Sequence, residues 1–153
     1  MSKKIEFEFN KPEDSPGFLL AQVTLIWQRK QKRVLDPLNL THTQFVLMSS
    51  LAWLSRENDS VTQVDIANLS NSDRMMVSRV LRLLEEKQFI TRQEHQRDTR
   101  AKIIKLTPTG EEVLQKAIVE VENADIEFFS AIKTNQESFN TAMIKLIEMN
   151  MNE

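Results

Sequence analysis

The side chains between residues 72 and 82 have the types and spacing needed to recognise nucleic-acid bases. They recur at intervals of one, three and four residues, with Ser72 just ahead of the others: Ser72, Arg74, Met75, Ser78, Arg79 and Arg82. An arginine carries a fork of donors that matches two acceptors of guanine, and a serine hydroxyl can bond a base or a phosphate. Such a face suits the major groove of double-stranded DNA. An ordinary solvated helix face would show the same pattern in isolation.

A second group of charged residues follows in a polar stretch. Its members are Arg92, Arg97, Asp98, Arg100 and Lys102. A cationic hairpin fits a narrow minor groove, where the negative potential of DNA is concentrated. We expect Asp98 to pair with Arg100 or a neighbouring arginine and to hold that side chain in one rotamer. The alternative is an ordinary charged hairpin tip.

The elements that would position both groups can be read from periodicity. A short helix begins after Thr62, which has Asp65 three residues on as in a capping box. A polar break at 70–72 leads into a helix over 73–87 that places Val77, Leu81 and Leu84 on one face. Residues 89–92 and 102–106 then change to strand patterns. This order predicts a helix-turn-helix followed by a two-stranded wing.

Helices flank this unit on both sides. Residues 18–35 carry a broad apolar stripe, and Thr41 or Thr43 can cap the next helix. In the last third, Thr107 and Pro108 begin a long helix, and residues 134–137 form a capping box for a final one. These helices have more apolar surface than one small lobe can cover, so the expected partner is a second copy.

The predicted fold is mainly α with a small β-wing: a winged helix-turn-helix plus a helical dimerisation region. We expect an N-terminal arm over 1–17, because apolar and acidic residues alternate over 5–9 before Pro12, Pro16 and Gly17. Residues 18–153 then form one domain. Its winged lobe spans about 37–107, and its dimerisation helices span about 18–35 and 108–150.

Charge is distributed unevenly along the chain. The formal net charge is −2, yet residues 70–102 hold eight Lys and Arg against five Asp and Glu, a local charge of +3. Phosphate binding responds to this local field. The chain has no cysteine and no apolar run of the roughly 20 residues that span a bilayer, which leads us to expect a cytoplasmic protein without disulfides, thiol switches or membrane contact.

The segment 98–110, DTRAKIIKLTPTG, resembles the D-x-R-x5-L-T-x-x-G signature of the multiple-antibiotic-resistance regulator (MarR) family. Residues 77–92, VSRVLRLLEEKQFITR, resemble that family's recognition helix and first wing strand, with Gln88 where the family often has glycine. The order of helices from Phe18 to Met149 also fits, so the resemblance covers nearly the whole chain.

The resemblance implies an obligate homodimer on a palindromic operator, acting as a repressor that a small ligand releases. It implies that Arg100 is a minor-groove arginine oriented by Asp98, and that Ser78 and Arg79 lie in the base-reading stretch. Family ligands are commonly held between the dimer region and the DNA-binding lobe. Candidates for such an aromatic or phenolic effector pocket are Trp27, His42, Phe45, Met48 and Trp53; an aromatic residue at helical spacing is otherwise a core residue.

Other classes of function have less support. His42 and His95 are far apart in sequence and no cysteine accompanies them, so we expect no metal site and no cofactor. No nucleophile–base pair or phosphate loop appears, so we expect no enzyme activity. The remaining alternative is a winged helix that has lost DNA binding and serves as a protein-interaction module, which the net acidic charge favours.

Overall fold

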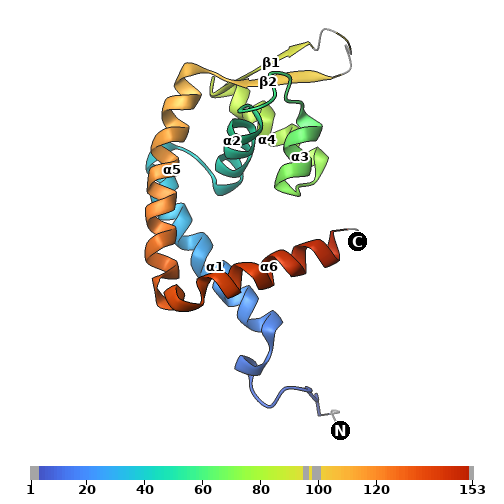
Figure 1. The fold of residues 1–153 in the computed structure, drawn as a ribbon, viewed down its shortest axis with the longest axis vertical. Helices are drawn as coiled ribbons and strands as arrows, with labels where there is room; N and C mark the ends of the chain where they lie inside the picture. Colours follow the sequence, from blue (N-terminus) through green and yellow to red (C-terminus); the bar gives the residue numbers. More distant parts are fainter. Residues whose placement is uncertain (1–3, 95–96, 98–100, 152–153) are drawn as a thin grey trace.

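The computed structural model describes residues 4–94, 97 and 101–151, and two regions are distinct within it. At one end, α2 (His42–Leu54), α3 (Gln63–Ser70), α4 (Arg74–Glu86), β1 (Ile90–Glu94) and β2 (Lys102–Leu106) form a winged lobe. At the other, α6 (Gln136–Asn150) lies with the first half of α1 (Pro16–Leu35) and the second half of α5 (Pro108–Phe129); we call this region the helical end. Figure 1 shows α1 and α5 connecting the two.

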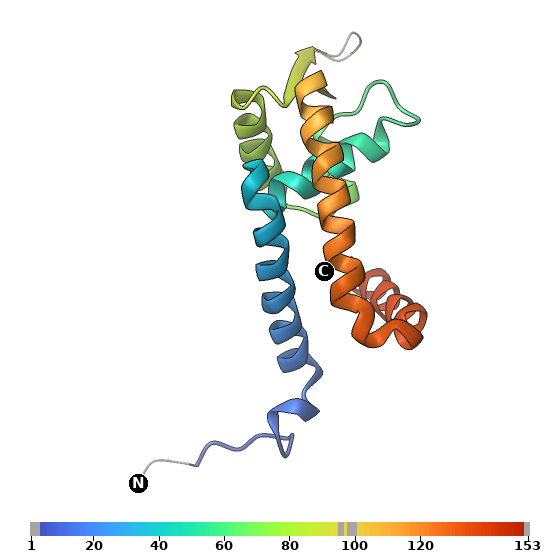
Figure 2. The same cartoon turned by 90° about the vertical axis from the view of Figure 1, so that its left-hand side faces the viewer.

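The long helices α1 and α5 pack against each other and run in opposite directions (Figure 2). The α1 helix begins two residues before the predicted start, because Ser15 caps it and Pro16 occupies its first position. At α5 the predicted start is confirmed: the Thr107 hydroxyl accepts a hydrogen bond from the Gly110 N–H at 3.0 Å. Only Gln31 and Leu35 of α1 are buried.

The start of α6 differs from the prediction. The capping box expected at 134–137 does not form, since the Thr134 hydroxyl bonds the Asn135 side chain at 2.8 Å instead. Thr134 lies inside a 3-10 helix, Ser130–Asn135, so the residue that precedes α6 is Asn135, with φ −111° and ψ 5°. A capping side chain needs an extended backbone at that position. Here the connection to α5 decides the local structure.

The helix-turn-helix is held together by local polar contacts that the sequence predicts. Thr41 and Gln44 form a capping box at α2, and Thr62 and Asp65 form another at α3. The turn after α3 requires a left-handed residue, which Asn71 supplies at φ 50°. Thr43, the other candidate cap for α2, lies inside that helix.

The wing is an antiparallel hairpin in which Ile90 pairs with Leu106 and Glu94 with Lys102. The second strand agrees with the prediction, whereas the first begins one residue later and extends two residues further than expected. The hairpin is fixed to the lobe because the Ile104 N–H donates to the Val61 carbonyl at 2.8 Å, just before α3.

The core lies in the winged lobe and the adjoining parts of α1 and α5. Its fully buried side chains include Leu35, Leu47, Met48, Leu51, Ile66, Val77, Leu81, Leu84, Ile90 and Ile104. By contrast, no described residue of α6 is buried. None of the described helices is both long and apolar enough to cross a membrane.

Candidate nucleic-acid interface

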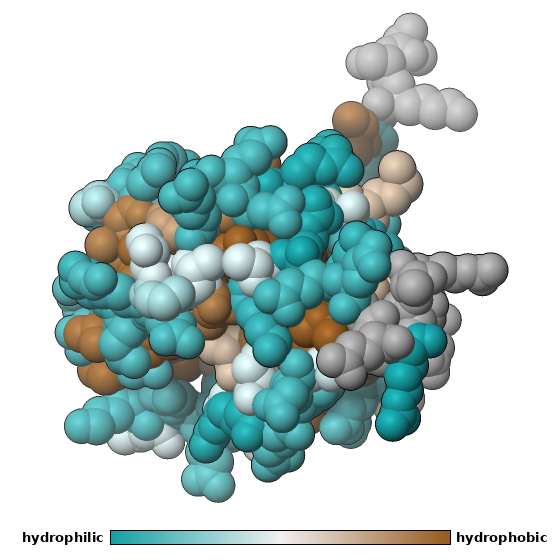
Figure 3. All heavy atoms as spheres, turned by 90° about the horizontal axis from the view of Figure 1, so that it is seen from above, coloured by the Kyte–Doolittle hydropathy of each residue, from teal (hydrophilic) through white to brown (hydrophobic). Residues whose placement is uncertain are grey.

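The helix α4 presents two faces of opposite character. Its inner face consists of Val77, Leu81 and Leu84, each with an exposed fraction of 0%. On the other side lie exposed Arg74, Met75, Arg79 and Arg82, together with half-buried Ser78. The inner face fixes the rotation of the helix about its axis, so Met75, Ser78, Arg79 and Arg82 form one outward stripe along it. Seen from the winged end, the surface is mostly hydrophilic (Figure 3).

Both ends of α4 are capped. At its start the Asp73 carboxylate accepts a hydrogen bond from the Met76 N–H at 3.0 Å. At its end Gln88 takes the left-handed conformation at φ 63°, and the Phe89 N–H donates to the Leu84 carbonyl at 3.0 Å. This is a Schellman motif, whose left-handed position glycine occupies at lower energy than other residues. The departure from the usual family residue at Gln88 therefore leaves the turn in place.

Lys87 ties the end of α4 to the segment before α2. Its Nζ donates to the Asn39 carbonyl at 2.6 Å and to Gln44 Oε1 at 3.0 Å. Sequence analysis did not identify Lys87, because its partners lie 48 and 43 residues away and no spacing rule connects them. Ser72, which was identified, lies half-buried in the turn before α4, where its hydroxyl donates to the Ser70 carbonyl at 3.3 Å.

Arg92 binds the recognition helix rather than extending from the wing. Its guanidinium donates to both carboxylate oxygens of Glu85, at 3.1 and 3.3 Å, and its side chain is 22% exposed. The hydrogen bond from Arg92 lowers the pKa of Glu85 below its ordinary value, and the charge of Lys102 adds a smaller effect. The pair fixes β1 to the last turns of α4, so the structure gives Arg92 a positioning contact within the lobe.

The rest of the predicted wing group divides in two. Arg97 and Lys102 are exposed, with Lys102 opposite Glu94 at the start of β2. Asp98 and Arg100, the pair to which the family resemblance gives the minor-groove role, lie outside the described residues, as does His95.

Close packing explains the glycine at position 110, the third residue of α5 and the fourth after the end of β2. A Cβ at this position would lie 2.0 Å from the Phe89 carbonyl oxygen, far inside van der Waals contact. Thr107 contacts the same segment just before β1. Its hydroxyl donates to the Gln88 carbonyl at 2.6 Å, and its N–H donates to the Phe89 carbonyl at 3.0 Å. The threonine and the glycine of the signature thus dock α5 directly onto the end of α4.

Trp27 and His42 meet at the junction of α1, α2 and α5. Their rings make an edge-to-face contact with centroids 4.9 Å apart. Asp125 of α5 joins them: one of its oxygens accepts from Trp27 Nε1 at 2.8 Å and from Gln31 Nε2 at 2.7 Å. Burial lowers the pKa of His42, and the Asp125 charge partly opposes this. Sequence analysis missed Gln31 and Asp125, which are separated from their partners by more than 90 residues.

The other three candidates for an effector pocket do not join this cluster. Met48 is fully buried in the core, and Phe45 packs against that core from a half-buried position. Trp53 is 63% exposed near the end of α2, about 16 Å along the helix from His42, where the Arg56 guanidinium lies 4.8 Å from its ring centroid. The described residues contain no group of three or more His, Cys, Asp or Glu placed to hold a metal ion.

The helix-turn-helix, the docked hairpin and the outward arginine stripe define a winged helix-turn-helix protein. The model of the MarR family matches residues 40–102. The uncharacterized HTH-type transcriptional regulator YdcH of Bacillus subtilis (strain 168) is 40% identical over 141 residues, covering 92% of this chain and 95% of that protein. The chain therefore belongs to the MarR family, and it is a transcriptional regulator rather than an enzyme.

Solved structures support the same fold. The complex of Staphylococcus aureus MepR with DNA superposes with a TM-score of 0.78 at 24% identity, covering 88% of this chain and 98% of that one. The transcriptional repressor CouR of Rhodococcus jostii RHA1, bound to p-coumaroyl-CoA, superposes with a TM-score of 0.78 at 21% identity, covering 92% and 95% of the two chains. At these identities the comparison carries the fold alone.

Proposed function

We propose that this regulator binds double-stranded DNA as a homodimer on a palindromic operator and represses transcription until a small ligand releases it. The observation that carries the proposal is the outward stripe of α4. Arg79 and Arg82 lie exposed on it, while the opposite face is anchored in the core by Leu81 and Leu84. A helix held in this way offers its arginines to the base edges of a major groove.

Local charge supports the same partner. Residues 70–102 carry a net charge of +3 in a chain whose total is −2, so the basic surface coincides with the helix-turn-helix and the wing. Arg97 and Lys102 would meet phosphates or the minor groove beside α4, and Arg100 and Asp98 take the minor-groove role by resemblance to the family. MepR, a protein of the same fold, has been solved with DNA bound.

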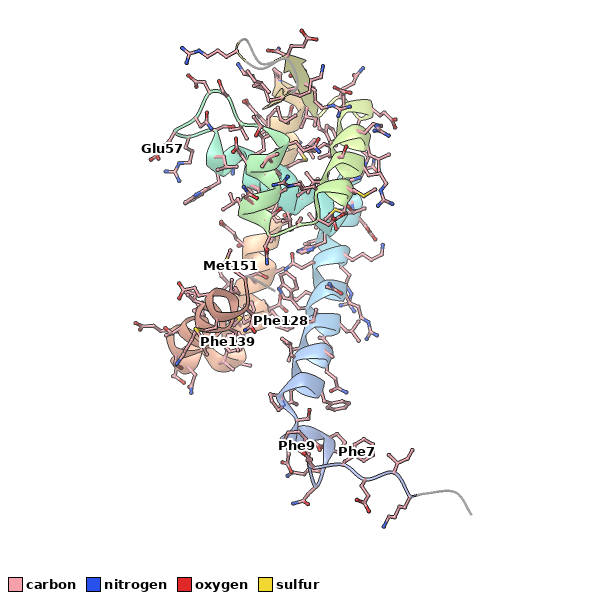
Figure 4. The ribbon with its side chains drawn as sticks, turned by 90° about the vertical axis from the view of Figure 1, so that its right-hand side faces the viewer. Phe7, Phe9, Glu57, Phe128, Phe139 and Met151 are labelled. Atoms are coloured by element: carbon pink, nitrogen blue, oxygen red, sulfur yellow. The ribbon has the colours of Figure 1, made fainter. Side chains whose placement is uncertain are left out.

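A second copy is proposed as the cover of the helical end. Its exposed apolar side chains include Leu20, Val23, Ile26, Ile126, Ile144, Leu146, Ile147 and Met149. In Figure 4, α6 lies apart from α1, and the corner between α5 and α6 carries Phe128 and Phe139. So many exposed apolar side chains at one end of a molecule are typical of an interface. A two-fold pair would place two α4 helices at successive turns of one duplex, and DNA covered in this way is closed to other proteins.

The effector site is proposed at the junction of α1, α2 and α5. It combines two aromatic rings with an acid: Trp27 and His42 in contact, and Asp125 within hydrogen-bond distance of Trp27. The buried Gln31 Oε1 has no hydrogen-bond partner among the residues that the structure describes, so a donor placed there would satisfy it. The chemistry of these groups matches an aromatic or phenolic ligand, whose ring could contact Trp27 and His42 and whose hydroxyl could donate to Gln31, and CouR has been solved with p-coumaroyl-CoA. A bound molecule would act on α1 and α5 together.

Selection of bound duplexes from a random pool, followed by salt titration, tests the proposal. We expect a two-fold symmetric sequence and a log–log dependence on salt with a slope of about −0.9 for each phosphate contact. Arg79→Ala should relax the preference at one or two base positions, by roughly 1–3 kcal/mol. Arg100→Ala should weaken binding to all duplexes, whereas Lys133→Ala, in the 3-10 helix that follows α5 at the helical end, serves as a charge-matched control.

The same salt titration distinguishes DNA binding from the alternative function, a winged helix that serves as a protein-interaction module. Binding that is absent, or that does not change with salt, would leave a winged helix used only for contact with other proteins. For the effector, phenolic acids added to the DNA complex should release the duplex, and Asp125→Asn should weaken that release more than it weakens DNA binding.

A further inference from the structure

Met75 stands out on the outward stripe of α4. Its side chain is 76% exposed, among the highest values for a large apolar residue in the described chain. Its neighbours on the stripe are Ser78, Arg79 and Arg82, all of which carry polar groups. The adjacent Met76 behaves differently, because it packs against the core. Met76 therefore contributes to the packing of the core, whereas packing within the subunit does not explain why residue 75 is a methionine.

Within the described part of the chain, Met75 is left largely uncovered. The apolar surface proposed for dimerisation lies on α1, α5 and α6, at the other end of the molecule from α4 (Figure 1). Arginine, glutamate, glutamine and lysine have helix propensities close to that of methionine, so helix formation does not require an apolar residue at this exposed place. A partner that covers Met75 has to be apolar at the point of contact. It has to be polar around that point, since arginines flank Met75 on the helix.

We infer that Met75 recognises the 5-methyl group of a thymine in each half-site; this rests on the proposed function. In the major groove the four bases present different groups, and a methyl group marks thymine alone. A methionine side chain has no donor with which to read an oxygen and only a weak acceptor with which to read an amino group, but it is long, flexible and polarizable, and it packs well against a methyl group. Met75 therefore distinguishes thymine from cytosine by apolar contact.

The position of Met75 on the helix fits this role. It is the second residue of α4, directly after Arg74 and the cap Asp73, and the N-terminal residues of a recognition helix approach the base edges most closely. Arg79 lies four residues further on, about 6 Å along the helix axis. That distance spans roughly two base pairs at 3.4 Å each. The thymine is expected within about two base pairs of the one that Arg79 reads.

Deoxyuridine provides the probe, because it keeps every hydrogen-bonding group of thymidine and lacks the methyl group. Each thymidine of the selected half-site is replaced in turn, in both half-sites at once, and affinity is measured for the full-length protein. At one position we expect the wild type to bind about fourfold more weakly for each lost methyl contact, and about fifteenfold for the symmetric duplex. Met75→Gln, which keeps the side-chain length, should bind the two duplexes equally.

Two further variants make the result specific. Met75→Leu retains an apolar end and should retain most of the preference for thymidine. Leu83→Ala removes an exposed apolar side chain, 46% exposed, from the same helix outside the stripe, and it should discriminate between the duplexes as the wild type does. Because Met75 and Leu83 are both exposed, neither change is expected to affect folding, which thermal unfolding checks.

The outcomes separate this inference from the function on which it rests. A half-site without thymidine, or a deoxyuridine series to which wild type and Met75→Gln respond equally, would overturn the role of Met75 and leave DNA binding intact. Failure of the wild type to bind any selected duplex in a salt-dependent manner would overturn the proposed function and the inference with it.

Discussion

The winged lobe and the helical end differ in how far their apolar side chains are buried within one subunit. In the lobe, Leu47, Leu51 and Leu81 are fully buried within one subunit. At the helical end, Ile126 is 72% exposed and Leu146 62% exposed, and α6 has no buried residue among those described. The lobe, with the adjoining parts of α1 and α5, therefore encloses a core, whereas the helical end leaves apolar side chains exposed in one subunit. This exposed surface is the one that we propose a second copy covers.

The largest difference in the free energy of unfolding should appear when the same substitution, leucine to alanine, is made in each of the two regions. Leu81→Ala should lower the free energy of unfolding by about 2–5 kcal/mol, because it leaves a cavity in a closed core. Leu146→Ala should cost little at low protein concentration and more at high concentration, because in the proposed dimer its contacts are made with the second subunit. Denaturant unfolding at several protein concentrations makes the measurement. Equal losses that do not depend on concentration would show that α6 belongs to the core of one subunit.

A charge at the helical end should break the dimer directly. Ile147→Glu places a carboxylate within the exposed apolar face of α6, and burying an unpaired charge costs several kcal/mol. We expect sedimentation to change from dimer to monomer, with salt-dependent DNA binding weakened accordingly. Thr141→Glu adds the same charge on the polar side of α6 and serves as the control. Dimers that survive Ile147→Glu but not Thr141→Glu would place the interface on the opposite side.

A smaller effect, of the opposite sign, is expected within the lobe. Gln88 holds a left-handed backbone at φ 63°, which costs a residue with a Cβ about 1 kcal/mol or more. Gln88→Gly should therefore raise the free energy of unfolding by roughly 0.5–1 kcal/mol, after the added flexibility of the unfolded chain is counted. The gain should be the same at every protein concentration. A loss of stability would mean that the Gln88 side chain makes a contact worth more than the strain.

The smallest effect is a pH dependence where the two regions meet. Burial lowers the pKa of His42 below 6.5, its ordinary value, so the unfolded chain takes up a proton before the folded one does. The free energy of unfolding should decrease as the pH falls through 6.5, until the folded pKa is reached. His42→Gln should remove this part of the slope, measured by denaturant unfolding between pH 7.5 and 5.5. An unchanged slope would assign the proton uptake to other groups.

Local patterns accounted for most of the fold. The caps at Thr41, Thr62 and Thr107 and the second strand of the wing depend on residues a few positions apart, which a sequence displays directly. The predicted cap at Thr134 was wrong because the preceding 3-10 helix had already set the backbone. Neighbouring elements override local preference at such junctions.

The candidate site divides in the same way. The outward stripe of α4 followed from helical spacing, since one face was clearly apolar. Spacing gave no sign that Arg92 would bind Glu85, or that Asp125 would connect Trp27 with Gln31, because those contacts depend on tertiary packing. Met48 and Trp53, grouped in sequence as aromatic or apolar candidates, lie respectively inside the core and on its outer surface.

The contact between Gly110 and the Phe89 carbonyl fixes the upper end of α5 tightly to the winged lobe. The helix has 22 residues, a length of about 33 Å. There is no room for even a methyl group between Gly110 and Phe89, in the turn that connects α4 to β1, so a tilt of α5 would push on this turn and through it on α4. A tilt of roughly 5° at the lower end displaces the upper end by about 3 Å, close to the rise of one base pair. In the dimer that we propose, small adjustments between the subunits would in this way shift each α4 by about one base pair along the DNA.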